Sequence, residues 1–170
     1  MPRFSIALPL ASSIALALAA ACSPSSSSGK TCNTYVAPAS TDLTSPVSFK
    51  TDIVGNVFKN HCAFSGCHGD EQILFLAYPK DDTVHTTDPG VIITNIVNAP
   101  SKELPTMPYV TPGDPTNSYM MHKMDGDNCT FQAKCVNQDC IDTMPRGNDL
   151  LDVPTRDLLR RWIAQGAKND

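Results

Sequence analysis

The feature that most constrains this chain is a pair of cysteines separated by four residues and followed directly by a histidine, in the segment CAFSGCH at residues 62–68. A Ser-Gly pair inside the spacer permits a tight turn, so the spacer can loop outward and still bring both sulfurs together. One interpretation is an ordinary disulfide between Cys62 and Cys67. Another is a zinc site with His61 and His68, although adjacent Cys and His residues rarely both bind one tetrahedral ion.

The order of these residues resembles the covalent haem-attachment motif of c-type cytochromes, whose usual form is C-x-x-C-H. The spacer here has four residues instead of two, as in the long-spacer variants of that family. The resemblance implies one covalently attached haem c, with thioether links from Cys62 and Cys67 to the haem vinyl groups. It also implies that His68 is the proximal ligand of the haem iron.

The resemblance further implies a methionine as the distal ligand of the iron. Met144 precedes a proline in a short polar segment upstream of the last predicted helix, where class I cytochromes carry this ligand. Met107 also precedes a proline and is the alternative distal ligand. Met120 and Met124 are four residues apart on a predicted helix, so we expect them to pack in the core. His122 would instead give ligation by two histidines.

The N-terminal residues predict export. Residues 1–21 have a basic residue near the start, an apolar run shorter than a membrane span, and small residues before Cys22. This layout resembles a bacterial lipoprotein signal, which implies lipidation of Cys22, and a plain cleaved signal is the alternative. Residues 22–47 are rich in Ser, Pro and Thr and are expected to form a flexible tether. We therefore expect a periplasmic or cell-surface protein anchored to the outer membrane by its N-terminal lipid.

The cysteine count also predicts disulfides. Of the 7 cysteines, four remain once Cys22 and the two motif cysteines are set aside, which is enough for two disulfides in an oxidising compartment. If only Cys22 is set aside, the other six cysteines could equally well form three disulfides without haem. Residues 126–142 hold three of the four and are interpreted as a disulfide-stapled insertion. The sequence leaves open how the four pair: Cys32, Cys129, Cys135 and Cys140.

Apolar periodicity predicts a helix at each end of the domain, which we place at residues 48–170. Directly before the cysteine motif, Phe49, Ile53 and Val57 repeat at helical spacing. Near the C-terminus, Pro154 fits the first turn of a helix whose apolar stripe includes Trp162. A helix that leads into the attachment motif and crosses a C-terminal helix with an aromatic on its inner face is the arrangement of class I c-type cytochromes.

Two Asp-Pro pairs, at residues 88–89 and 114–115, predict the starts of two shorter helices in the middle of the domain. The second helix is expected to run to Met124 and to end at Gly126. The fold class predicted from the sequence is therefore all-α: a cytochrome c-like helical domain with long Pro-rich loops and a disulfide-stapled insertion.

Taken together, these features predict a haem-binding electron-transfer protein of the cell envelope rather than an enzyme. With histidine and methionine ligands the iron is coordinatively full, which favours exchange of single electrons with a redox partner protein that the sequence does not identify. A net charge of −4 without a basic cluster argues against nucleic acid as a partner. The alternative is a cofactor-free, disulfide-stabilised surface lipoprotein that acts as a binding module. A third possibility is a haem enzyme with an open iron position.

Overall fold

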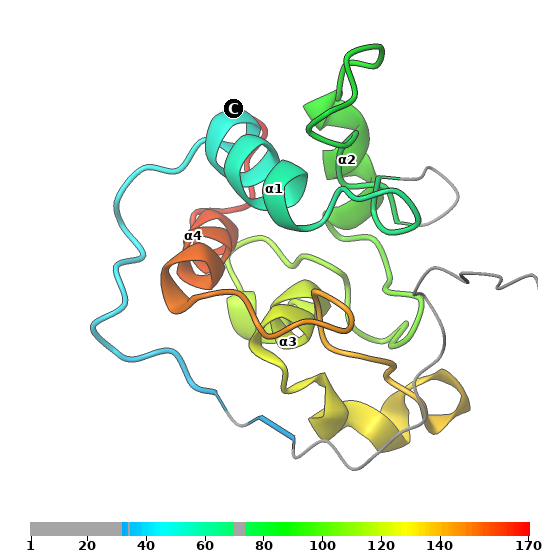
Figure 1. Ribbon diagram of the computed structural model, residues 1–170. Helices are drawn as coiled ribbons and strands as arrows, with labels where there is room; N and C mark the ends of the chain where they lie inside the picture. The colour runs from blue at the N-terminus through cyan, green and yellow to red at the C-terminus, as the bar shows by residue number, and fades with distance from the viewer. Residues whose placement is uncertain (1–31, 34, 70–73) are drawn as a thin grey trace, which may run out of the picture.

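The computed structural model describes residues 32–33, 35–69 and 74–170 (Figure 1). The predicted signal peptide and the lipidation site Cys22 lie outside these residues. Within the described part of the chain there is no strand, only two isolated β-bridges, and no helix is long and apolar enough to cross a membrane. In chain order the elements are η1 (Phe49–Phe58), α1 (Lys59–His61), α2 (Pro89–Ile96), η2 (Pro115–Asn117), α3 (Tyr119–Asp125), η3 (Asn128–Lys134), η4 (Val136–Gln138) and α4 (Val153–Ala164).

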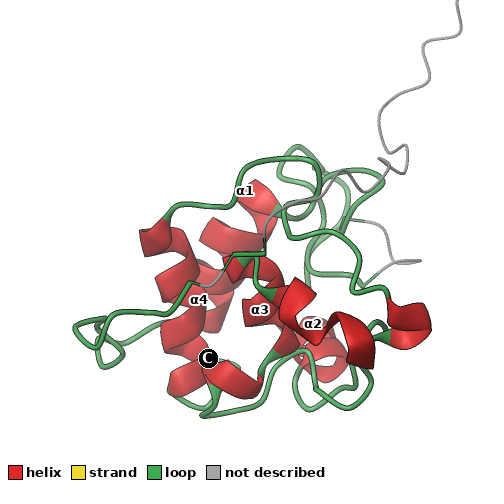
Figure 2. Ribbon diagram, turned by 90° about the horizontal axis from the view of Figure 1, so that it is seen from below, coloured by secondary structure: helices red, strands yellow, loops and turns green. Residues whose placement is uncertain are grey.

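The expectation of an all-α, cytochrome c-like helical domain is wrong. Only 40% of the described residues are helical, in short segments, and loops make up most of the rest (Figure 2). Two disulfides join these loops, so the molecule is a small disulfide-containing fold. The chain has 14 prolines. A proline inside a helix removes a backbone hydrogen bond and clashes with the preceding turn, so a chain this rich in proline cannot sustain long helices.

Helices η1 and α1 form one continuous helical segment that ends directly before the cysteine motif, as the sequence predicts. The Ser48 hydroxyl begins it by accepting a hydrogen bond of 3.3 Å from a backbone N–H of the first turn. Its apolar side chains, including Ile53 and Val57, are fully buried. The backbone N–H of Cys62 still bonds to the last turn, at 2.9 Å, so the helical segment fixes the position of the first motif cysteine.

Helix α4 packs against η1 and completes the core (Figure 1). The Asp152 carboxylate caps α4 by accepting a hydrogen bond of 3.0 Å from the Thr155 N–H, and Pro154 lies in the first turn. The buried ring of Trp162 stacks on Phe49 with a centroid distance of 4.7 Å and an interplanar angle of 20°. The predicted packing of the last helix on the first is thus confirmed, although the fold around them differs from the expected one.

Both Asp-Pro pairs begin helical segments, as the sequence predicts. Asp88 caps α2 by accepting a hydrogen bond of 2.8 Å from a backbone N–H of its first turn. Asp114 caps only the short η2, because Ser118 adopts an extended conformation and interrupts the segment. Helix α3 starts after this break and ends at Gly126, whose φ of 77° is left-handed and therefore suits glycine.

The described residues that precede η1 run along the domain (Figure 1). Cys32 forms a disulfide with Cys129, which lies 97 residues further along the chain. Next to it, the Asn33 side chain donates a hydrogen bond of 2.7 Å to the Asp125 carbonyl. Cys32 and Asn33, which lie within residues 22–47, are therefore bonded to the domain.

A buried carboxylate joins α3 to α4. Asp125 accepts hydrogen bonds from Arg156 at 2.6 Å and from Arg160 at 2.8 Å, and all three side chains are buried. The ring of Tyr35 lies 4.4 Å from the Arg156 guanidinium, in cation–π contact. Because a buried charge without a partner is strongly destabilising, this cluster fixes how the N-terminal segment, α3 and α4 pack together.

Candidate functional site

A largely apolar cavity of about 150 Å³ lies next to the cysteine motif. This volume is below the range of about 300–1,000 Å³ that is usual for small-molecule and cofactor sites, so a ligand of cofactor size would extend beyond the cavity. Its walls come from the end of η1, the loop after the motif, the loop at residues 102–109, α3 and α4. The apolar part of the lining consists of Phe58, Leu74, Leu76, Met120, Met124 and Leu159.

His68 lies on the wall of this cavity with one ring nitrogen already engaged. Its Nδ1 lies 2.7 Å from the Leu74 carbonyl oxygen, which can only accept, so this nitrogen carries a proton. Burial lowers the pKa of His68, although the hydrogen bond to the Leu74 carbonyl opposes the shift. The neutral ring therefore keeps its proton on Nδ1 and leaves the Nε2 lone pair for a metal, an arrangement usual for histidine ligands.

The two motif cysteines differ in position. Cys62 lines the cavity, and burial, with a smaller contribution from Cys67, raises its pKa to about 12, so the thiol is protonated at neutral pH. Cys67 follows a turn in which Gly66 has a φ of 77° and the Cys67 N–H bonds to the Phe64 carbonyl at 2.9 Å. The tight turn expected from the Ser-Gly pair is therefore present. Cys67 precedes His68 directly but is not part of the cavity lining.

The methionines are divided between the cavity and a second cluster. Met144 lines the cavity together with Cys62 and His68. Met107 packs instead with a separate buried cluster that contains Cys135 and Cys140. The geometry therefore brings Met144, and not Met107, to the same cavity as His68.

Met120 and Met124 also line the cavity, although the sequence analysis expected them to be core residues. They belong to the main core cluster as well, so both descriptions apply. Their spacing of four residues places them on one face of α3, and the same spacing in the sequence indicates that both side chains share one face.

The other histidines lie elsewhere. His122 does not line the cavity, and its two ring nitrogens already bond to the Asp127 carboxylate at 2.9 Å and the Thr116 carbonyl at 3.0 Å. It is therefore unsuited to bind a metal in the cavity. His85 is exposed and bonds to Asp82 at 2.8 Å. Among the described residues, no group of three or more His, Cys, Asp or Glu side chains is arranged to hold a metal ion.

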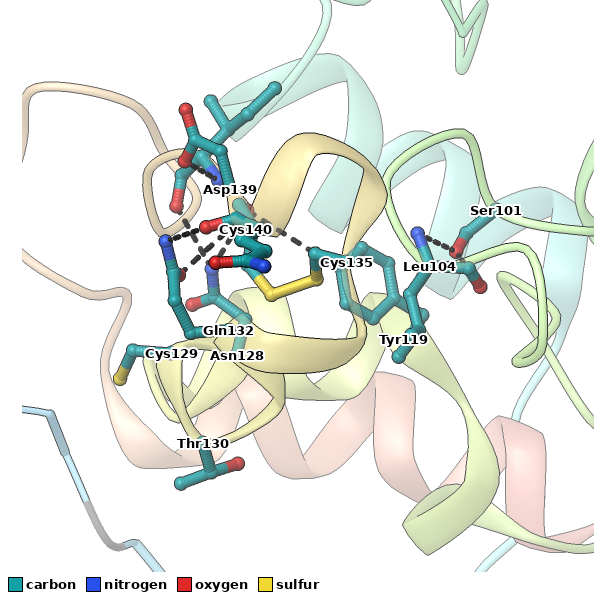
Figure 3. Close-up of a disulfide and its surroundings, with 12 residues drawn as sticks. Ser101, Leu104, Tyr119, Asn128, Cys129, Thr130, Gln132, Cys135, Asp139 and Cys140 are labelled. Atoms are coloured by element: carbon teal, nitrogen blue, oxygen red, sulfur yellow. Dashed lines mark hydrogen bonds between the residues drawn. A yellow bond between two sulfur atoms is a disulfide. The ribbon is translucent and has the colours of Figure 1, made fainter.

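A polar group of cavity residues was missed by the sequence analysis. Lys123 and Tyr119, both on α3 and both buried, line the cavity, and both donate to the carbonyl oxygen of Cys140, at 2.9 and 3.2 Å. The Asn128 amide donates to the same oxygen at 3.1 Å (Figure 3). Glu103 also lines the cavity. Burial lowers the pKa of Lys123, and the negative charge of Glu103 opposes that shift.

The disulfides are Cys32–Cys129 and Cys135–Cys140, which gives the pairing that the sequence left open. Cys62 and Cys67 lie outside both disulfides, so the alternative in which the motif forms a disulfide is not seen. Only the second disulfide is internal to residues 126–142. The first connects that segment to the N-terminal one.

Comparisons with protein-family models, curated proteins and solved structures give no match to this chain. Its function therefore has to be inferred from the chemistry of the site itself.

Proposed function

We propose that this protein binds one haem c covalently and transfers single electrons in the cell envelope. The observation that carries the proposal is that Cys62 and His68 of the cysteine motif line one apolar cavity together with Met144, which comes from a distant loop. They are the residue types that a c-type haem requires: a thiol for a covalent link, an imidazole and a thioether for the iron. The proposed scaffold is the loop-rich disulfide fold described above.

The state of His68 supports a role as an iron ligand. Its Nδ1 proton is held by the Leu74 carbonyl, which sets the ring orientation and leaves Nε2 as the donor nitrogen. A bound haem would supply one-electron redox chemistry at its iron. Met144 would hold the other axial position, and a site with both positions filled favours electron transfer over oxygen or peroxide chemistry.

Cys62 and Cys67 would hold the porphyrin. Cys62 already faces the cavity, and Cys67 immediately precedes the proposed ligand His68.

The location of the protein is part of the proposal. Residues 1–21 and Cys22 support export and an N-terminal lipid anchor in the outer membrane. Disulfides form and persist in oxidising compartments, and the two disulfides agree with a position outside the cytoplasm. A redox partner protein is required there to deliver or accept the electron.

The test is expression of the full chain in a host with cytochrome-maturation machinery, followed by denaturing electrophoresis and a reduced pyridine haemochrome spectrum. We expect haem to stay with the denatured wild-type chain at one per protein. Cys62→Ser and Cys67→Ser should each remove one thioether link, which moves the main visible band of the haemochrome to longer wavelength. A Cys67→Ser variant with an unchanged spectrum would show that only Cys62 is linked.

His68→Ala and His85→Ala form a matched pair for the iron ligand. We expect His68→Ala to lose haem or its low-spin spectrum, and the exposed His85 to be replaceable without effect. A colourless wild-type protein from the same host would contradict the proposed function. The cofactor-free surface lipoprotein would then be the better description.

A further inference from the structure

Lys123 is a buried cation on the wall of the cavity. Its side chain is 6% exposed, although it belongs to a residue type that is almost never buried without a partner. Its ammonium donates to one carbonyl oxygen, that of Cys140, at 2.9 Å, and lies 5.7 Å from the centre of the Tyr119 ring in a long cation–π contact. Among the described residues, it has no carboxylate within 4.0 Å.

The position of the ammonium is set by the Cys135–Cys140 disulfide. The carbonyl oxygen of Cys140 also accepts hydrogen bonds from Tyr119 at 3.2 Å and Asn128 at 3.1 Å. Figure 3 shows this carbonyl beside the disulfide, with the Tyr119 ring next to Cys135. Since the disulfide and three donors fix this oxygen, the charged end of Lys123 is held at the cavity wall and cannot easily swing out into solvent.

The charges around the cavity leave a place for an anion. Lys102 and Lys123 are its two cations and Glu103 is its one carboxylate. Of these three, only Lys123 is more than nine-tenths buried. An ammonium has three protons to donate, and a single carbonyl is a poor substitute for the water that burial removes. A ligand that brings a carboxylate into the cavity would supply the missing partner.

We propose that Lys123 binds a carboxylate of the ligand that fills this cavity, and thereby orients a flat apolar molecule whose other end lies against His68. This inference rests on the proposed function, because a porphyrin is a flat apolar ring that carries carboxylates. It adds to that function the residue that recognises the acidic edge of the ligand. Cys140 and its disulfide act as positioning elements for Lys123.

The test compares two metal-free porphyrins, mesoporphyrin IX and its dimethyl ester, which lack both iron and reactive vinyl groups. Binding is measured by porphyrin fluorescence with the full chain purified from a host without maturation machinery. A charge-assisted hydrogen bond in a buried site is worth enough to favour the free acid over the ester by about tenfold or more. We expect Lys123→Gln to abolish this preference and Lys123→Arg to retain much of it.

Lys134→Gln is the matched control, because Lys134 is an exposed lysine that does not line the cavity. It should leave the preference for the acid nearly unchanged. Unfolding midpoints are measured for every variant, and Lys123→Met, which keeps the apolar stem, replaces Lys123→Gln if that variant does not fold. A preference that survives the loss of Lys123, or that the wild type lacks, would overturn the inference.

The two proposals fail in different ways. A wild-type chain that carries covalent haem after maturation but shows no preference for the free acid would overturn only the role of Lys123. A chain that carries no haem after maturation would overturn the proposed function, and the inference about Lys123 would fall with it.

Discussion

Removal of the Cys32–Cys129 disulfide is expected to cost this protein much of its stability. The bond joins residues 97 positions apart, whereas Cys135–Cys140 joins residues only 5 apart. The chain-entropy model, in which a crosslink restricts the unfolded chain, gives about 4.7 kcal/mol for the long loop and about 2 kcal/mol for the short one. A domain of this size usually has about 5–15 kcal/mol in total, so the first loss is large.

The measurement is urea unfolding of two double variants, Cys32→Ser with Cys129→Ser and Cys135→Ser with Cys140→Ser. With an m-value of about 2 kcal/mol/M, the midpoint should fall by about 2 M for the first variant and about 1 M for the second. The wild type in the presence of a reductant serves as the control, and it should lose at least as much as the first variant.

The refuting result is equal losses for the two variants, or a larger loss for the short disulfide. Either would mean that native contacts, and not the freedom of the unfolded chain, decide the effect. The Asn33 hydrogen bonds to the end of α3 would remain possible in the variant, which is why we assign the loss mainly to the unfolded state.

Three further outcomes follow from the geometry. Asp125→Asn should lower the free energy of unfolding by about 3–5 kcal/mol in urea titrations, because it leaves the buried Arg156 guanidinium without a charged partner and leaves Arg160 with Asp157 alone. Asp142→Asn, in an exposed pair, should cost less than about 1 kcal/mol. Equal losses would contradict the argument from burial. Burial lowers the pKa of His122, but the hydrogen bond and charge of the neighbouring aspartate outweigh it and raise the pKa overall. The stability gained from protonated His122 is therefore complete below its ordinary pKa of about 6.5 and lost as pH rises through the raised pKa. The stability difference between wild type and His122→Gln should thus shrink as pH rises above about 6.5 and must not grow. In haem-loaded protein, Met144→Ala should remove the weak sulfur-to-iron band at long wavelength while Met107→Ala retains it; the opposite pattern would transfer the ligand role to Met107.

The ends of the helices could be predicted because capping is local chemistry. Asp88 and Asp152 each accept a hydrogen bond from the first turn that follows them, and Gly126 adopts the left-handed conformation that ends α3. The break at Ser118 could not be predicted in this way. Its hydroxyl bonds to the Thr111 N–H at 2.8 Å, and such a contact competes with the helix only once the loop has folded back.

The architecture could not be predicted, because loops and not helices determine it. The even number of cysteines is compatible with two disulfides and also with three, and pairing depends on which segments meet in space: Cys32 meets a residue 97 positions further along the chain. The helical pattern in the middle of the chain predicts short helices, and these alone do not define a cytochrome c-like domain. The short helices that the prolines permit do not support that fold.

The candidate site was predictable where its residues form a local motif. Cys62 and His68 are six positions apart and lie on one cavity wall, whereas Lys123 carried no signal at all. A lysine on a short helix is usually solvated, and this one is buried because its ammonium meets the carbonyl of Cys140, which lies 17 residues further along the chain. Contacts of this kind depend on the folded loop and leave no pattern in the sequence.

The two disulfides therefore have different roles. Cys32–Cys129 closes a long loop and restricts the unfolded chain, so its effect is mainly on stability. Cys135–Cys140 closes a short loop and restricts the unfolded chain much less, yet it fixes the carbonyl oxygen that holds both Lys123 and Tyr119 at the cavity. The cavity walls of this fold are largely loops. A short disulfide that fixes a loop carbonyl therefore holds polar side chains in place, as packed helices do in larger cores. The long disulfide should thus mainly affect the stability of the fold, and the short one the placement of Lys123 at the cavity.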